Sequence, residues 1–191
     1  MLNLPNSLTI LRILMIPLFL EFLAYRFYWE ALVVFAIAGF TDFLDGLMAR
    51  WLHQETALGV YLDPLADKLL VMSSFIMLAS IESIPMWLAV VVVARDALIV
   101  VGYSVIYFLI EERLQVRPSW IGKWSTAFQL LTVVLALALL HDSNMFSAAV
   151  LNLFVRLTAL MTVLSGCQYF YRGLLWLQEK RPSRPGLPPP G

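Results

Sequence analysis

Residues 41–68 read TDFLDGLMARWLHQETALGVYLDPLADK and place four aspartates inside a chain that is otherwise strongly apolar. Of the 191 residues, 61% are hydrophobic and 14% are charged. The mean hydropathy is +0.81. These values are far too apolar for a soluble domain of this length. The composition therefore predicts an integral membrane protein.

On both sides of this stretch the sequence divides into runs of about 20 apolar residues, the length that crosses a bilayer as a helix. Six runs occur, over residues 7–25, 30–52, 58–80, 84–110, 121–141 and 145–175. Asn6 or Ser7 is a typical N-cap for the first run. We therefore expect one all-α membrane domain, residues 1–180, with six transmembrane helices in one bundle. The proline-rich residues 181–191 cannot continue a helix and are predicted to form a disordered tail.

The basic residues of the short connections predict the orientation, because such residues favour the cytoplasmic side. They gather after the second, fourth and sixth runs, at Arg50, Arg113, Arg117, Lys123, Arg172, Lys180, Arg181 and Arg184. The opposite side has Arg26. Both termini are therefore expected in the cytoplasm. The 13 basic and 13 acidic residues balance, and this topology leaves no basic patch, so we expect no nucleic-acid partner.

The four aspartates of the opening stretch form two pairs along their helices. Asp42 and Asp45 are three residues apart, and Asp63 and Asp67 are four apart, so each pair faces one side of its helix. The polar turn at residues 53–55 makes the two helices antiparallel neighbours, and their acidic faces are expected to meet. Buried like charges repel one another unless cations lie among them. Ligand sets made only of oxygen favour Mg²⁺, Mn²⁺ or Ca²⁺.

Small residues and an arginine accompany these acids. Gly46 and Ala49 share the face of the first pair, and Gly59 lies one turn before the second pair. These positions leave room beside the carboxylates, while Arg50 offers bidentate geometry for phosphate. The set predicts a metal-bound pyrophosphate and transfer at phosphorus, with a carboxylate as proton acceptor. Two alternatives are acids that only cap helices or pair with Arg50 and Lys68, and a cation or proton transporter.

Written as a pattern, these positions resemble the signature of the CDP-alcohol phosphotransferases. The chain reads Asp42-x2-Asp45-Gly46-x2-Ala49-Arg50-x8-Gly59-x3-Asp63-x3-Asp67, and every position of the signature is filled. Four further segments are similar to the bacterial phosphatidylglycerophosphate synthases of that family. They are NLPNSLTILRI, LDPLADKLL, WIGKWSTAFQ and LSGCQYFYRG.

The resemblance implies a six-helix enzyme, a homodimer in the bacterial cytoplasmic (inner) membrane, with its active site facing the cytoplasm. It implies attack of an alcohol on the β-phosphorus of CDP-diacylglycerol and release of CMP. By position, two divalent cations, Mg²⁺ or Mn²⁺, would be bound by Asp42, Asp45, Asp63 and Asp67. Asp67 would also be the general base. The residues bordering the CDP moiety would be Gly46, Ala49, Arg50 and Gly59.

The resemblance also bears on the acceptor alcohol. Family members with phosphorylated acceptors bind that phosphate through cations of the fourth and fifth spans, which are here Arg95 and Lys123. We therefore expect sn-glycerol 3-phosphate as the acceptor and phosphatidylglycerophosphate as the product. The chain departs from that group at Asp96, where glutamate is typical, and at residues 102–104, where a second arginine is typical. These departures favour the alternative acceptor, phosphatidylglycerol, as in cardiolipin synthases of the same superfamily.

Both acceptor residues also have a structural interpretation. Arg95 would then only pair with Asp96, and Lys123 would anchor the cytoplasmic end of its helix. The position of Arg95 inside an apolar run favours a functional role. We interpret the aromatic residues 169–171 as an interfacial belt.

Overall fold

The computed structural model describes the backbone of residues 4–52, 59–110 and 119–179, and the side chains of residues 9–41, 66–102 and 119–173. Within these ranges it contains six α-helices and no strand. They are α1 (Leu4–Ala24), α2 (Tyr28–Leu52), α3 (Gly59–Ser80), α4 (Met86–Ile110), α5 (Trp120–His141) and α6 (Ala148–Glu179). Each helix overlaps one of the six predicted runs, so the all-α prediction is confirmed.

The helix ends differ from the predicted ends by a few residues. α1 begins at Leu4, so the prediction that Asn6 or Ser7 caps this helix is wrong. Pro5 accounts for the earlier start, because its fixed φ suits the first turn, where its missing N–H loses no helical hydrogen bond. α6 continues past its predicted end at residue 175 to Glu179, since no proline interrupts it before the tail.

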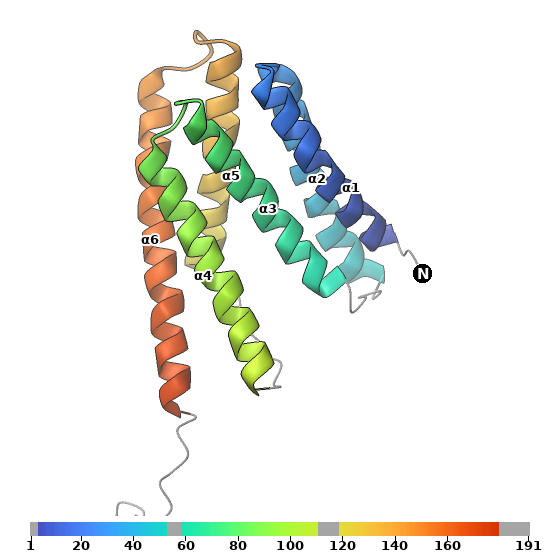
Figure 1. Cartoon of the computed structure of the whole chain (residues 1–191), viewed down its shortest axis with the longest axis vertical. Helices are drawn as coiled ribbons and strands as arrows, with labels where there is room; N and C mark the ends of the chain where they lie inside the picture. Colours follow the sequence, from blue (N-terminus) through green and yellow to red (C-terminus); the bar gives the residue numbers. More distant parts are fainter. Residues whose placement is uncertain (1–3, 53–58, 111–118, 180–191) are drawn as a thin grey trace, which may run out of the picture.

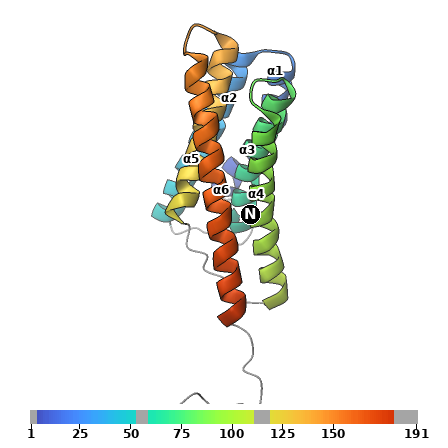
Figure 2. The same ribbon diagram turned by 90° about the vertical axis from the view of Figure 1, so that its left-hand side faces the viewer.

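Successive helices alternate in direction along the bundle (Figure 1). α1 contacts α2 and α3, α4 contacts α3 and α6, and α5 contacts α2, α3 and α6. We call the end where α1, α3 and α5 begin the lower end, and the opposite end the upper end, as they lie in Figures 1 and 2. The first residues of α1 and the last residues of α6 therefore both lie toward the lower end.

Two connections at the upper end are tight turns closed by residues with positive φ. Arg26 has φ 63° after α1, and the following N–H of Phe27 donates to the carbonyl of Phe22 at 2.8 Å. Glu82, with φ 60°, follows α3, and the next N–H, of Ser83, donates to the carbonyl of Leu78 at 3.0 Å. A residue in the left-handed region satisfies the last carbonyls of a helix and reverses the chain. The turns thereby hold the following helices close to the preceding ones.

The apolar core fills the upper half of the bundle. The rings of Phe19 in α1 and Phe35 in α2 lie 5.7 Å apart, and Phe75 of α3 is fully buried beside them in the same cluster. Helices α1, α3, α4 and α5 contribute fully buried aliphatic side chains, among them Leu23, Leu78, Leu88, Val92, Val133 and Leu137. The core therefore lies above the level of Asp67.

α5 and α6 are joined by polar side chains instead. The hydroxyl oxygens of Thr132 and Thr158 lie 2.7 Å apart. Nε2 of Gln129 donates to Oγ1 of Thr162 at 3.3 Å, and Oγ of Ser125 lies 3.3 Å from the same oxygen. All five side chains are fully buried. Hydrogen bonds between small polar side chains are a typical way to join apolar helices.

Two helices of the described residues are long and apolar enough to cross a membrane, by length and composition. They are Trp120–His141 and Ala148–Gly173. α2 adds a shorter apolar stretch, Tyr28–Thr41. Six transmembrane spans with cytoplasmic termini stay a prediction.

Replacing Phe75 by alanine is expected to lower the free energy of unfolding by about 3 kcal/mol or more, because it leaves a cavity in the centre of the core. Reversible unfolding in mixed detergent micelles measures this change. The matched control is Ile76→Ala, since Ile76 is the next residue of α3 and is 54% exposed. We expect a loss of about 0.5 kcal/mol there. Equal losses for both variants would contradict the described core.

Candidate active site

The backbone of both predicted aspartate pairs is helical. Asp42 and Asp45 lie in the second half of α2, and Asp63 and Asp67 lie in the first half of α3, so each pair keeps its predicted helical spacing. Several predicted residues lie outside the described side chains, namely Asp42, Asp45, Gly46, Ala49, Arg50, Gly59 and Asp63. The four-carboxylate metal site and the CDP-binding residues therefore stay predictions.

Asp67 has a described side chain, and it forms an ion pair with Arg12. Nη1 of Arg12 in α1 donates to Oδ1 of Asp67 in α3 at 2.6 Å. The side chain of Arg12 is 1% exposed, whereas that of Asp67 is 40% exposed. The guanidinium is therefore buried against the bundle, and the carboxylate that it holds is partly exposed.

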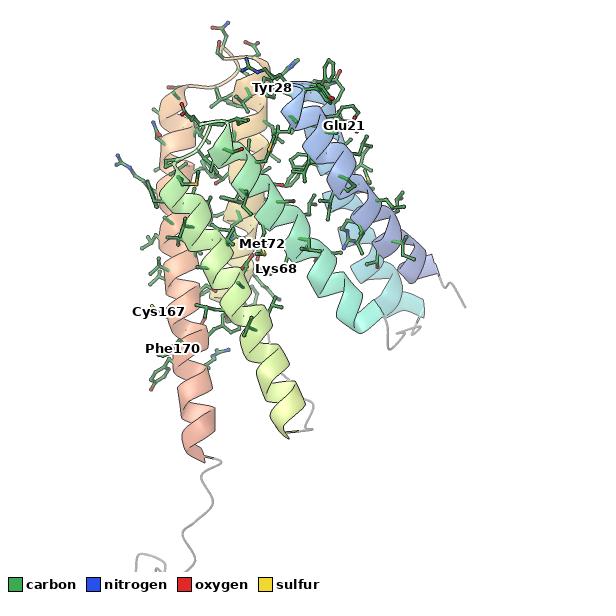
Figure 3. All side chains as sticks on the ribbon, in the orientation of Figure 1. Glu21, Tyr28, Lys68, Met72, Cys167 and Phe170 are labelled. Carbon is green, nitrogen blue, oxygen red and sulfur yellow. The ribbon has the colours of Figure 1, made fainter. Side chains whose placement is uncertain are left out.

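A second charged cluster begins at the next residue of α3. Nζ of Lys68 lies 2.9 Å from Oδ1 of Asp96 in α4, and Nη1 of Arg95 donates to the same oxygen at 2.5 Å. Asp96 is fully buried, Arg95 is 6% exposed and Lys68 is 21% exposed. Figure 3 shows Lys68 on α3 where this helix passes α4. The contact of Arg95 with Asp96 that the structural alternative requires is present. The three side chains carry one net formal positive charge.

Arg95 also reaches α6. Its Nη2 donates to Oγ of Ser165, and its guanidinium carbon lies 5.6 Å from the ring centroid of Tyr169. Nε of Arg95 and Oδ2 of Asp96 are buried and have no hydrogen-bond partner in the described part of the chain. Buried polar atoms are almost always satisfied in native proteins. A polar group bound beside the cluster would therefore find a free donor in Arg95 and a free acceptor in Asp96.

Tyr169 connects this cluster to the start of α5. Its hydroxyl oxygen lies 3.2 Å from the position that a Cβ on Gly122 would take, so the glycine allows this approach. Lys123 follows Gly122, is exposed, and holds its Nζ 5.2 Å from the ring centroid of Trp120. Among the described residues no contact joins Arg95 to Lys123. The structure thus does not bring the two predicted acceptor residues together among the described contacts.

Within the aromatic residues 169–171, Tyr169 differs from its two neighbours. Its ring contacts the guanidinium of Arg95 and is only partly exposed. Phe170 and Tyr171 are 71% and 62% exposed, as a belt requires, and Figure 3 shows Phe170 pointing away from the bundle. Which of three consecutive residues turns inward depends on the rotation of α6 against α4, and composition does not specify that rotation.

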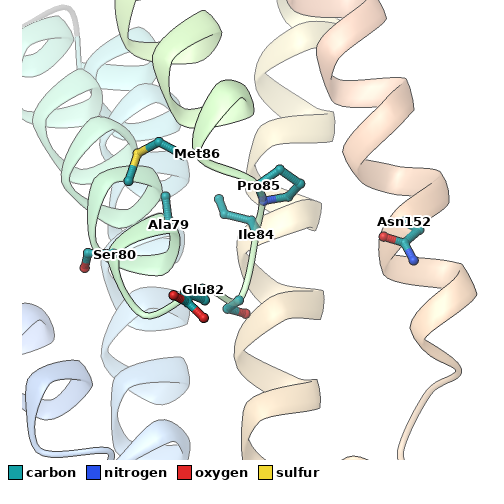
Figure 4. Close-up of a pocket in the computed structure, with 8 residues that line it drawn as sticks. Ala79, Ser80, Glu82, Ile84, Pro85, Met86 and Asn152 are labelled. Atoms are coloured by element: carbon teal, nitrogen blue, oxygen red, sulfur yellow. The ribbon is translucent and has the colours of Figure 1, made fainter.

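An open pocket of about 540 Å³ lies at the upper end of the bundle. Residues that end α3 and begin α4 line it, together with Asn152 of α6 (Figure 4). Ala79, one of its lining residues, follows Asp67 by twelve positions in the same helix, a rise of about 18 Å. The pocket is therefore separate from the charged clusters, and no residue predicted to be functional lines it.

The family model of the CDP-alcohol phosphatidyltransferases matches residues 2–165. The chain belongs to this family. It is 33% identical over 187 residues to the CDP-diacylglycerol--glycerol-3-phosphate 3-phosphatidyltransferase of Bacillus subtilis, which covers 89% of this chain and 94% of that protein. It is 40% identical over 148 residues to the enzyme of that name from Pseudomonas fluorescens, covering 71% of this chain and 72% of that protein.

A relative with another name is also similar to the chain. The human cardiolipin synthase (CMP-forming) is 32% identical over 186 residues, which is 90% of this chain and 62% of that protein. The predicted family is therefore confirmed, and two acceptor classes occur among the relatives by name.

Two residues at the site, Arg12 and Lys68, were not predicted from the sequence to have a function. Arg12 had a signal, because it is a charged residue in the apolar run of α1, where a charge needs a partner. Lys68 follows an aspartate of the family signature directly. Neither signal identifies the partner, since Arg12 and Asp67 are 55 positions apart and Lys68 and Asp96 are 28 apart.

Replacing Asp96 by asparagine is expected to lower the free energy of unfolding by about 3 kcal/mol, because Arg95 and Lys68 lose their shared counter-ion. Unfolding in mixed micelles checks this. Asp142→Asn is the matched control, since Asp142 is exposed at the end of α5 and its carboxylate accepts from the N–H of Asn144. There the loss should be about 0.5 kcal/mol. A wild-type stability of the Asp96 variant would show that the cluster does not hold α3 against α4.

Proposed function

We propose that this chain is a metal-dependent phosphatidyltransferase of phospholipid synthesis. It transfers the phosphatidyl group of CDP-diacylglycerol to sn-glycerol 3-phosphate, which gives phosphatidylglycerophosphate and CMP. The observation that carries the proposal is the partly exposed carboxylate of Asp67, held by a buried arginine and followed by a cluster of net positive charge. The names of the bacterial relatives support the same donor and acceptor.

In this reaction Asp67 is the general base. Its carboxylate takes the proton of the acceptor hydroxyl, whose oxygen attacks the β-phosphorus of the donor. The bond from this phosphorus to the oxygen of CMP breaks, and CMP leaves. The exposed carboxylate of Asp67 and the all-oxygen donor set of the aspartate pairs fit Mg²⁺ or Mn²⁺. Two such ions, when bound, neutralise the charge that develops on the phosphate oxygens.

The chain's own residues would hold the substrates on either side of that base. Asp42, Asp45 and Asp63 join Asp67 as metal ligands in the proposal. The CDP moiety would be bordered by Gly46, Ala49, Arg50 and Gly59. These roles rest on the signature positions in α2 and α3, whose helical spacing the backbone keeps.

Arg95 and Lys123 would hold the phosphate of the acceptor. The cluster of Arg95, Asp96 and Lys68 carries net positive charge, and Nε of Arg95 has no partner within the described residues. Because Lys68 directly follows Asp67, an anion bound at this cluster would lie within one helical turn of the base along α3.

Phosphatidylglycerol is the second candidate acceptor. Arg95 is 6% exposed and already contacts Asp96, Ser165 and Tyr169, which leaves less of its charge for a free phosphate. The similarity to a cardiolipin synthase points in the same direction. An acceptor with a phosphodiester needs fewer cationic contacts than one with a phosphomonoester, because it carries less charge.

We place the six helices across the bacterial cytoplasmic membrane. The distribution of side chains supports this, since Leu14 and Leu98 are exposed at the middle of their helices while several threonine, serine and glutamine side chains are buried. Such outward apolar surface is unusual for a protein in water. α5 has 22 residues, about 33 Å of helix, which matches the hydrocarbon thickness.

Exposed aromatic residues at both ends of the bundle support the same placement. Trp29 and Trp87 are about half exposed at the upper end, and Trp120 and Phe170 are more than two-thirds exposed at the lower end. Aromatic belts of this kind mark the two membrane–water interfaces. The basic residues then put the lower end, both termini and Asp67 on the cytoplasmic side. The homodimer implied by the family resemblance stays a prediction.

The test is CMP release by the purified protein with CDP-diacylglycerol, supplied separately with sn-glycerol 3-phosphate, with phosphatidylglycerol or without acceptor. We expect CMP release with sn-glycerol 3-phosphate and a product with the mass of phosphatidylglycerophosphate. EDTA should abolish the release, and added Mg²⁺ or Mn²⁺ should restore it. Release with phosphatidylglycerol alone would select the second candidate. No release with any acceptor would overturn the proposal and return attention to cation or proton transport.

Asp67→Asn should lower kcat by at least about 100-fold, because asparagine keeps the shape and the contact to Arg12 but does not accept the proton. Binding of CDP-diacylglycerol should persist, which equilibrium binding of the labelled lipid measures. Glu21→Gln is the matched control, since Glu21 is an exposed carboxylate near the upper end of α1, as Figure 3 shows. Turnover of the Asp67 variant near that of the wild type would exclude Asp67 as the base.

A further inference from the structure

Arg12 is among the largest fully buried side chains of the described residues. A buried guanidinium is expensive to desolvate, and a well-packed apolar side chain often stabilises a protein as well or better. α1 and α3 already pack through apolar residues such as Phe19 and Phe75 in the upper core. Joining the two helices does not by itself require an arginine at this position.

The two charged pairs differ in which member is exposed, the acid or the base. In the pair of Arg12 and Asp67 the cation is 1% exposed and the carboxylate is 40% exposed. In the pair of Lys68 and Asp96 the carboxylate is fully buried and the ammonium is 21% exposed. The first pair therefore presents an acid to the site, and the second presents a cation. The buried member of each pair fixes the position of the member that faces outward.

We infer that Arg12 is a positioning residue that holds the carboxylate of Asp67 in the orientation needed to take the proton of the acceptor hydroxyl. This role rests on the proposed function. The planar guanidinium is a rigid donor, and its Nη1 holds Oδ1 of Asp67 at 2.6 Å. A base displaced by about 1 Å loses a large part of its rate, on the order of 100-fold. The contact thus bears on the rate of proton transfer more than on substrate binding.

The charge of Arg12 also affects metal binding, and this effect is unfavourable. A fixed cation beside Asp67 opposes the binding of a divalent cation to the same carboxylate. Removing the guanidinium should therefore leave Mn²⁺ binding unchanged or make it tighter, although it slows the reaction. Replacing a residue that only maintained the fold would instead slow the reaction and weaken Mn²⁺ binding together, because a disordered site binds metal less well.

The experiment compares Arg12→Met and Arg12→Lys with the matched control Arg156→Met. Arg156 is an exposed arginine in α6 and belongs to neither charged cluster. Three measurements are made on the full-length protein in lipid: the kinetics of CMP release, which give kcat and KM, the dissociation constant for Mn²⁺ by electron paramagnetic resonance, and the melting temperature. We expect R12M to lower kcat by about 10- to 100-fold, with KM changed by less than about threefold and Mn²⁺ bound at least as tightly as in the wild type.

R12K should lie between R12M and the wild type in kcat, because lysine keeps the charge without the rigid fork. R156M should match the wild type in all three measurements. A wild-type kcat in R12M would overturn the inference and leave the proposed function intact. Parallel losses of kcat, Mn²⁺ binding and melting temperature would make Arg12 a structural residue and also overturn it.

If R12M does not fold, R12K decides the question. A wild-type kcat in R12K would then overturn the positioning role, whereas a lower kcat with wild-type Mn²⁺ binding would support it. Absence of turnover in the wild-type protein itself would overturn the proposed function, and the role of Arg12 with it. The wild-type result therefore separates a failure of the function from a failure of this inference.

Discussion

The need to neutralise charge inside an apolar bundle determines how the lower half of this protein is organised. Charged side chains are stable there only beside opposite charges, and α3 supplies a partner to α1 and another to α4. Asp67 pairs with α1 and Lys68 pairs with α4, although the two residues are adjacent in sequence. Because consecutive residues of a helix point about 100° apart, one helix can serve two clusters. α3 thereby brings the carboxylate of Asp67 and a positive cluster within one turn of each other.

The apolar core and the charged clusters lie in different halves of the bundle. Its upper half is held by an apolar core and by two turns closed through residues with positive φ. Its lower half contains the charged clusters, whose partly exposed members face outward. Between α5 and α6 a row of buried hydroxyl and amide groups continues from one half toward the other, and Ser165 extends it to Arg95. The helices that hold the polar groups of the site are therefore also held together by contacts outside the site.

Much of the fold could be predicted from the sequence, because apolar runs of helical length separated by polar turns leave few alternatives. The contact of Arg95 with Asp96 was also predictable, since the residues are neighbours in the chain. The pair of Arg12 and Asp67 was not, because it depends on how α1 is placed and rotated against α3. The inward turn of Tyr169 depends in the same way on α6. Sequence patterns indicate which side chains need partners, while only the packing of helices decides the partners.

Gly122 shows how a residue without a side chain can limit what its neighbours become. The hydroxyl of Tyr169 occupies the space beside it, and the ring of Tyr169 lies under the guanidinium of Arg95. A methyl group at position 122 would press on the tyrosine, and the tyrosine in turn would press on the arginine. Positions 122 and 169 thus share one volume, so that during the divergence of related chains growth at one requires a shift or a smaller residue at the other.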